Sequence, residues 1–195
     1  MLSSIHPLGE RTRNNRWLIT VASFTAGSIA AAALVGAALG GLGSVLPMSL
    51  SPDATLIAMG VVAVAAGFLD ASGAPVPGPE RQVNEHWIGS FRGWVYGGAF
   101  GVQLGTGVST FVVTWGVYAT FLLEMLTASP SLGALIGAVF GAGRSIGLFL
   151  AARVDRASRL TSFHSRMATL GPPVRLVAEY GAVAIGLFSV FGVML

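Results

Sequence analysis

The sequence contains no cysteine, and only 10% of its 195 residues are charged. Without cysteine the chain can form no disulfide, thiol nucleophile, iron–sulfur cluster or thiolate metal site. An ordinary soluble domain carries about 25% charged residues. Here 53% of the residues are hydrophobic and the mean hydropathy is +0.75. The composition excludes a soluble domain and predicts an integral membrane protein.

Lysine is also absent, so all 11 basic residues are arginine, and the net charge is +3. Arginines at the ends of spans hold loops on the cytoplasmic side of a membrane, and this role is sufficient to explain the excess. We therefore expect no nucleic-acid partner. Arginine without lysine, beside abundant alanine and glycine, is typical of a GC-rich bacterial genome. The expected location is the cytoplasmic membrane of a bacterium, with the chain crossing it several times.

Five apolar stretches are candidate spans, since a helix needs ~20 residues to cross a bilayer. They cover residues 17–46, 54–70, 94–126, 132–152 and 176–195. The first is far longer than the core of a signal peptide, so we interpret it as a retained span. The expected fold is an all-α transmembrane bundle of about five spans, forming one domain over 1–195, with no soluble domain.

The arginines favour five crossings over six. If 94–126 crosses once, all arginines except Arg144 fall on one side of the membrane. A second crossing there would move the arginines of 153–175 to the opposite side, against the positive-inside bias. The sequence therefore predicts an inside N-terminus and an outside C-terminus.

Small residues recur at four-residue spacing in three of the stretches, which lets helix backbones approach closely in lipid. The expected packing positions are Gly36, Gly40, Gly97, Gly101, Gly105, Gly133, Gly137 and Gly141. The glycine density at 97–107 is also typical of a broken or re-entrant helix that lines a path. Both interpretations remain open at this point.

The inside loops contain two amphipathic segments. In 155–170, apolar residues recur at helical spacing with arginines on the other faces, which predicts a helix lying on the membrane surface. Gly171, Pro172 and Pro173 are expected to end it. A shorter segment covers 80–91. Each could anchor the chain to the bilayer or dock a cytoplasmic partner.

Arg144 lies inside a span, ~13.5 Å along a helix from Arg153, too deep to reach the surface easily. A charge at this depth is costly and needs a partner or a function. Gln103 lies at a comparable expected depth on the other glycine-rich helix. We expect Arg144 to cap the carbonyls of a broken helix or to bond Gln103. An anionic solute site is the alternative.

Asp70 and Glu179 have similar expected depths near the inner surface, where either could meet Arg175. We interpret them as carboxylates at the membrane interface, and the alternative is that they are proton-coupling groups. The three histidines have no metal-ligand spacing, and Ser109 and Thr110 have no histidine or acid nearby in the sequence that could activate them. We expect no catalytic residue, no cofactor and no metal, and the protein not to be an enzyme.

The stretch from Arg92 to Thr110, with its glycine-rich helix start and small-polar run, resembles the opening of the second half of the CcdA/DsbD-type transmembrane fold of the LysE-like transporter group. The Pro-Cys pairs that carry electrons in that family have no counterpart here. The resemblance therefore implies a small carrier-like helical fold without redox activity.

Two functions of different classes follow from these features. The leading hypothesis is a small-solute transporter, with Arg144, Gln103 and the segment 97–107 at the path. The alternative is a non-catalytic accessory subunit of a larger membrane complex, packed through its glycine faces and inside helices. The expected partners are the lipid bilayer and either copies of the chain itself or other membrane subunits.

Overall fold

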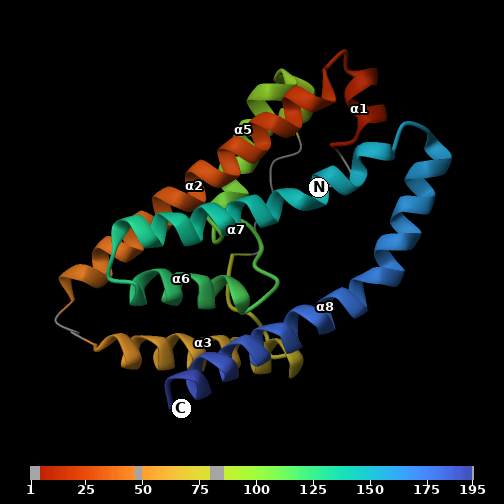
Figure 1. Ribbon diagram of the computed structural model, residues 1–195. Coiled ribbons are helices and arrows are strands. Elements are labelled where there is room, and N and C mark those ends of the chain that lie inside the picture. The colour runs from red at the N-terminus through yellow and green to blue at the C-terminus, as the bar shows by residue number, and fades with distance from the viewer. Residues whose placement is uncertain (1–4, 47–49, 80–85, 195) are drawn as a thin grey trace. The chain divides into compact units, whose positions relative to one another are not determined.

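The computed structural model describes residues 5–46, 50–79 and 86–194, and every regular element in these ranges is a helix (Figure 1). The helices are α1 (Pro7–Thr12), α2 (Trp17–Val45), α3 (Pro52–Ala71), α4 (His86–Ser90), α5 (Gly93–Gly105), α6 (Gly116–Leu126), α7 (Pro130–Leu150), the 3-10 turn η2 (Ala151–Arg153) and α8 (Ala157–Met194). The predicted all-α class is confirmed.

Four of these helices are long and apolar enough to cross a membrane: α2, α3, α7 extended to Arg153, and α8. The apolar stretch at 94–126 is divided into α5 and the shorter apolar helix α6. The non-helical residues 106–115 separate the two, and Gly107 takes a positive φ of 77°, a conformation that glycine adopts readily. The break therefore begins at the end of the segment 97–107, in which a broken helix was expected, and extends to residue 115.

The chain divides into two compact units. The first contains residues 1–32, 79–111 and 138–170, and the second contains 33–78, 112–137 and 171–195. Three helices, α2, α7 and α8, therefore contribute to both units. Each unit is described by itself below.

The first unit is built on the N-terminal half of α2, with α1, α5 and the end of α7 packed against it. Its core contains Val21, Phe24, Tyr96, Phe100 and Leu148, all at most 1% exposed. The indole of Trp87 from α4 stacks on the ring of Phe100 at 6.0 Å between centroids. Residues 80–85 of the predicted amphipathic segment 80–91 lie outside the described residues, and α4 occupies much of the remainder.

The second unit brings together α3, α6 and the C-terminal half of α8, which lie side by side in Figure 1. The helix α3 begins at Pro52, because Ser51 accepts a hydrogen bond from the Ala54 amide at 3.2 Å and proline fits the first helical turn. The C-terminal part of α2, from residue 33, and the first part of α7, up to residue 137, complete the unit.

The helix α8 differs from the sequence expectation, because it runs through Gly171, Pro172 and Pro173 without ending there. Each proline removes one backbone donor from the helix. Residues 164–178 are all exposed, so the released carbonyls stay accessible to other donors and no buried acceptor is left unpaired. The expected break instead coincides with the boundary between the two units, which falls between Leu170 and Gly171.

Candidate functional site

The small residues of α5 lie directly against the backbone of α2 in the first unit. A Cβ atom added at Gly97, Gly101 or Gly105 would come within 2.6, 2.0 and 2.4 Å of the carbonyl oxygens of Thr20, Phe24 and Ser28, respectively. No side chain larger than the hydrogen atom of glycine fits at these positions. The glycine stripe thus sets how closely α5 and α2 approach.

The α7 stripe meets α2 in the same way. In the first unit, a Cβ at Gly141 would lie 2.5 Å from the Ser28 carbonyl oxygen, and the Ser28 hydroxyl donates to the Gly141 carbonyl at 2.9 Å. In the second unit, Gly36 and Gly133 face each other, and a Cβ on either would lie 2.1 Å from the carbonyl oxygen of the other. Gly40 similarly approaches the Ser129 carbonyl, and Gly137 is buried.

A buried carboxylate joins three helices of the first unit, and the sequence analysis did not single it out. The Glu10 side chain is fully buried. It accepts hydrogen bonds from Arg13 Nη1 at 2.9 Å, Thr20 Oγ1 at 2.8 Å and the Tyr96 hydroxyl. This Glu10 cluster ties α1 to α2 and α5. The available signal was the acid–base pair Glu10 and Arg13 at helical spacing.

Arg144 lies on α7 in the first unit, half-buried, with its guanidinium 5.2 Å from the centre of the Phe140 ring. This is a cation–π contact one helical turn apart. Among the residues that the structure describes, no hydrogen bond joins Arg144 to Gln103 and no acid forms an ion pair with it. The Gln103 backbone carbonyl instead accepts from the Thr106 hydroxyl at 2.8 Å, at the end of α5.

Asp70 holds the start of α6 in the second unit. Its carboxylate accepts a hydrogen bond from Thr114 Oγ1 at 2.5 Å and another from the Trp115 backbone amide at 2.8 Å. Thr114 Oγ1 in turn accepts from the Gly116 amide at 3.0 Å. Asp70 therefore satisfies donors at the N-terminus of α6, where a negative charge is favoured by the helix dipole. After the interruption at residues 106–115, the helix α6 therefore begins where Thr114 and Trp115 donate to Asp70.

The structure brings Glu179 and Arg175 to the same place. Arg175 Nε donates to Glu179 Oε1 at 2.5 Å, and Arg175 Nη2 donates to the backbone carbonyl of Asp70 at 2.6 Å. The Glu179 side chain is 7% exposed. We refer to Asp70, Thr114, Trp115, Arg175 and Glu179 as the Asp70 cluster. It links α3, α6 and α8.

A groove of about 550 Å³ opens beside the Asp70 cluster. Its other walls are mostly alanine and glycine from α3, α6 and α8. Further along the two helices, α3 and α8 approach closely, since a Cβ at Gly60 would lie 2.6 Å from the Gly186 carbonyl oxygen and one at Gly186 would lie 2.5 Å from that of Gly60. Sequence reasoning missed this crossing, although Gly60 and Gly67 are seven residues apart on α3 and indicate it.

Glu124 of α6 is a further buried carboxylate in the second unit. Its side chain is 1% exposed, and Oε2 has no hydrogen-bond partner among the described residues. A Cβ at Gly36 would lie 3.0 Å from Glu124 Oε1, so the acid lies beside the crossing of α2 and α7. The single acid within an apolar helix was its signal in the sequence.

The arrangement is suited to holding helices together. In the Asp70 cluster, Asp70 accepts from donors at the start of α6, and Arg175 of α8 joins Glu179 of its own helix to the Asp70 carbonyl of α3. No group of three or more metal-binding side chains occurs in the described part of the chain. The fold and these contacts define an all-α, polytopic membrane protein whose polar residues close a packed helical structure.

The curated proteins that match the chain are methylamine utilization proteins. It is 33% identical over 130 residues to the methylamine utilization protein MauF of Paracoccus denitrificans, covering 66% of this chain and 47% of that protein. It is 30% identical over 149 residues to MauF of Paracoccus versutus, covering 73% and 54%. For MauF of Methylophilus methylotrophus the identity is 28% over 149 residues, covering 74% and 52%.

The chain therefore spans about half the length of the curated relatives it matches. No family model matches it, and no solved structure matches it significantly. The leading sequence hypothesis, a small-solute transporter, is wrong, because the relatives carry the name of a methylamine utilization protein and not of a transporter. The accessory alternative fits them better.

Proposed function

We propose that the chain is a non-catalytic accessory protein of methylamine utilization, located in the bacterial cytoplasmic membrane, where it holds other membrane proteins of that process. The observation that carries the proposal is its similarity to three methylamine utilization proteins over 66 to 74% of its length. The carrier-like fold implied by the resemblance to the CcdA/DsbD-type group remains a proposal about fold alone.

The contacts of the candidate site support this function. Glu10 and Asp70 accept from donors on adjacent elements, and Glu179 pairs on its own helix with Arg175, which donates across to α3, so these charges stabilise the helix arrangement. The helices also leave large apolar side chains exposed, among them Leu34 of α2, Val139 of α7 and Phe188 of α8. Such faces contact lipid or the helices of other subunits.

A chimera tests the proposal. In a Paracoccus denitrificans strain from which MauF has been removed, the stretch of MauF that matches this chain is replaced by the corresponding residues of this chain. We expect growth on methylamine to return, with growth on succinate unchanged throughout. Uptake of labelled methylamine should be equal in the strains with and without the chimera.

Two variants of the chimera provide a matched control on one helix. Gly141→Val should abolish the recovery, because a Cβ there meets the Ser28 carbonyl at 2.5 Å, whereas Gly143→Val should preserve it, because nothing lies within 4 Å. A chimera that reaches the membrane at normal amounts without restoring growth would contradict the proposal. Loss of methylamine uptake without the chimera would contradict it as well.

A further inference from the structure

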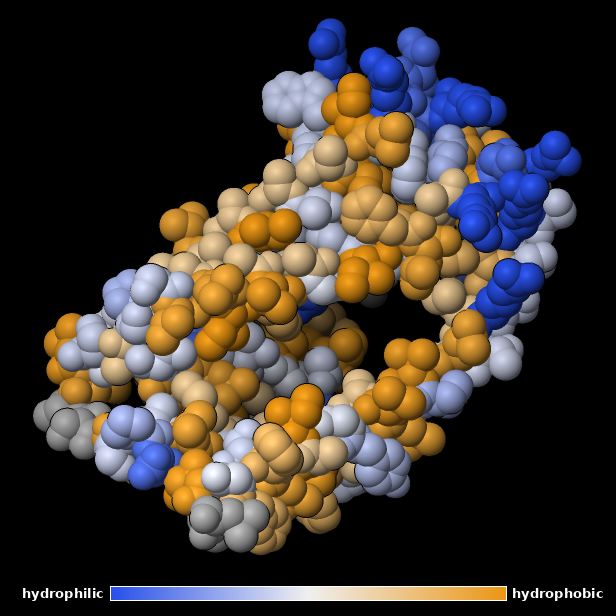
Figure 2. Space-filling view, in the orientation of Figure 1, coloured by the Kyte–Doolittle hydropathy of each residue, from blue (hydrophilic) through white to orange (hydrophobic). Residues whose placement is uncertain are grey.

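A groove of about 690 Å³ lies where α7 ends and α8 begins, entirely within the first unit. The turn that forms it is fixed, because the Leu8 amide donates to the Val154 carbonyl at 3.2 Å and Val154 is 3% exposed. Figure 2 shows hydrophilic residues gathered beside hydrophobic ones at this end of the unit. The groove therefore lies beside a turn that is hydrogen-bonded to α1, at a boundary between polar and apolar surface.

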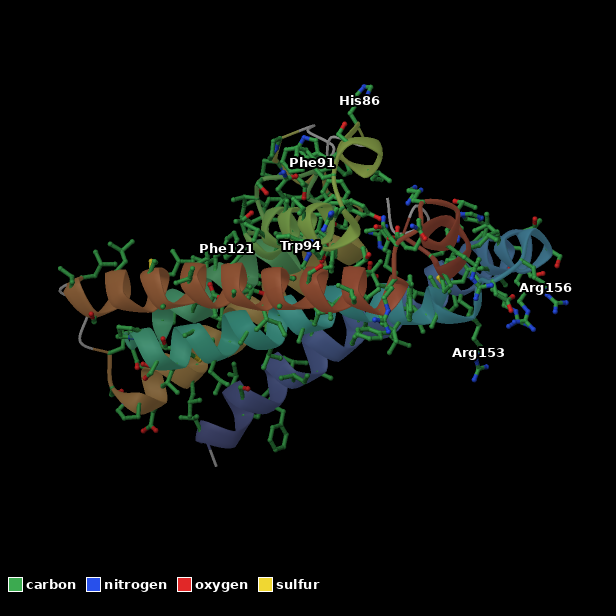
Figure 3. All side chains as sticks on the ribbon, turned by 90° about the horizontal axis from the view of Figure 1, so that it is seen from above. His86, Phe91, Trp94, Phe121, Arg153 and Arg156 are labelled. Carbon is green, nitrogen blue, oxygen red and sulfur yellow. The ribbon has the colours of Figure 1, made fainter. Side chains whose placement is uncertain are left out.

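Part of the lining of the groove is basic. Arg153, Arg159 and Arg166 line it, and no acidic residue does. Arg159 forms an ion pair with the half-buried Asp155 at 3.0 Å. Within the described part of the chain, the side chains of Arg153 and Arg166 have no hydrogen bond or ion pair. Figure 3 shows Arg153 projecting away from the ribbon. The groove thus presents uncompensated positive charge.

The rest of the lining is largely apolar, and its large side chains are open. Phe149, Leu150, Met167 and Leu170 line the groove, with exposed fractions of 51, 55, 37 and 50%. Phe163 and Met167 are one turn apart on α8, next to the row that carries Arg159 and Arg166. Apolar side chains left open beside free arginines match a ligand that is anionic at one end and hydrocarbon at the other.

We propose that this groove binds the headgroup of an anionic phospholipid, with phosphate oxygens on the free arginines and the start of an acyl chain on the apolar side chains. The arginines of 153–175 are those that the positive-inside bias assigns to the cytoplasmic face, where anionic lipids give a negative surface potential. Guanidinium groups bind phosphate oxygens in two places. Free phosphate contacts only the arginines, so the exposed apolar side chains of the lining favour the lipid.

Native mass spectrometry of the purified full chain tests the site by counting bound lipid. The detergent-solubilised protein is titrated with phosphatidylglycerol and, separately, with phosphatidylcholine of the same acyl chains. We expect phosphatidylglycerol to bind more tightly and to raise the melting temperature. Combining Arg153→Gln with Arg166→Gln should weaken phosphatidylglycerol binding roughly tenfold or more, since each surface arginine contributes separately. Arg156→Gln should leave binding unchanged, because exposed Arg156 does not line the groove.

Four outcomes would overturn the proposal. Equal binding of both lipids, or equal loss of affinity in Arg156→Gln, would show that the groove arginines do not select an anionic headgroup. If inorganic phosphate raised the melting temperature as much as phosphatidylglycerol does, the ligand of the groove would be a soluble anion and not a lipid. If an acidic amphipathic peptide displaced the lipid at a concentration lower than that of the lipid, the ligand of the groove would be a protein segment. If the double variant does not fold, Arg166→Gln alone carries the comparison.

Discussion

Replacing Gly141 with alanine should destabilise the protein, whereas the same change at Gly143, two residues further along α7, should not. An added Cβ at Gly141 would lie 2.5 Å from the Ser28 carbonyl oxygen and 2.9 Å from the Ile29 Cα. Carbon–oxygen contacts normally begin at about 3.3 Å, so α2 and α7 must separate by roughly 0.8 Å here. At Gly143 nothing lies within 4 Å of the added atom.

The expected cost has two parts. Separation breaks the hydrogen bond from Ser28 Oγ to the Gly141 carbonyl, now 2.9 Å, which contributes about 1 kcal/mol. Strain and lost packing along the crossing add about 1 to 3 kcal/mol. Gly141→Ala should therefore lower the free energy of unfolding by about 2 to 4 kcal/mol. Gly143→Ala should raise it by up to about 1 kcal/mol, because alanine is the better helix former.

The assay is equilibrium unfolding in mixed micelles, with SDS added to protein in a mild detergent and helix content followed by circular dichroism. Ser28→Ala separates the two parts, because it removes the hydrogen bond without adding bulk and should cost only about 1 kcal/mol. The Gly141 carbonyl keeps its bond from Ser145 Oγ at 3.1 Å in that variant. Equal stability of Gly141→Ala and Gly143→Ala would refute the close approach of α2 and α7.

Further predictions concern the N-terminal cluster and the topology. Glu10→Gln should lower stability by about 2 to 3 kcal/mol in the same assay, because Arg13 and two hydroxyl donors lose a buried carboxylate; a change below 0.5 kcal/mol would show that the cluster is not needed. Burial, followed by the charge of Arg13, lowers the pKa of His6, whose Nδ1 caps α1 by accepting from the Gly9 amide at 3.0 Å. His6 therefore stabilises the fold at pH values above its ordinary pKa near 6.5, and this stabilisation is lost as the pH falls through the lower pKa of the folded state. His6→Asn keeps an acceptor that can cap α1, so it should remove this dependence of stability on pH. An unchanged profile of stability against pH in His6→Asn would exclude His6 as its source. Single cysteines at Ser51 and Ser158 of this cysteine-free chain should be labelled from opposite sides of an intact membrane, and labelling of both from one side would contradict the five-span topology.

The fold class and most of the helices could be predicted from the sequence, because apolar length and small-residue spacing are local properties. The spans expected at 17–46 and 54–70 nearly coincide with α2 and α3. Where α5 ends and α6 restarts could not be predicted, because the restart depends on Asp70, 44 residues away, accepting from Thr114 and Trp115. Tertiary contacts determine that boundary.

The helix end predicted at the prolines of α8 is wrong for a different reason, because here a local signal was followed and the structure does not obey it. A Gly-Pro-Pro triplet is a strong local signal for a helix end. The helix continues because the surrounding residues are exposed and no buried carbonyl depends on the missing donors. Local rules overestimated the cost of two prolines at an exposed position, and the signal instead coincides with the boundary between the two units.

Candidate polar residues were located by sequence reasoning with uneven success. Asp70, Glu179 and Arg175 were placed near one another from their positions at span ends, and the structure brings them into one cluster. The relation between Arg144 and Gln103 was inferred from depth alone, which does not give the rotational position of a side chain on its helix. Glu10 was overlooked because its donors Thr20 and Tyr96 are distant in sequence.

The composition of the particle that contains this chain in native membranes tests the accessory role most directly. Membranes from cells of its own host grown on methylamine are solubilised in mild detergent, and the tagged chain is purified for native mass measurement. We expect a particle that contains the 20.0 kDa chain and at least one other membrane protein in fixed stoichiometry. A particle whose mass is accounted for entirely by copies of this chain would contradict the account.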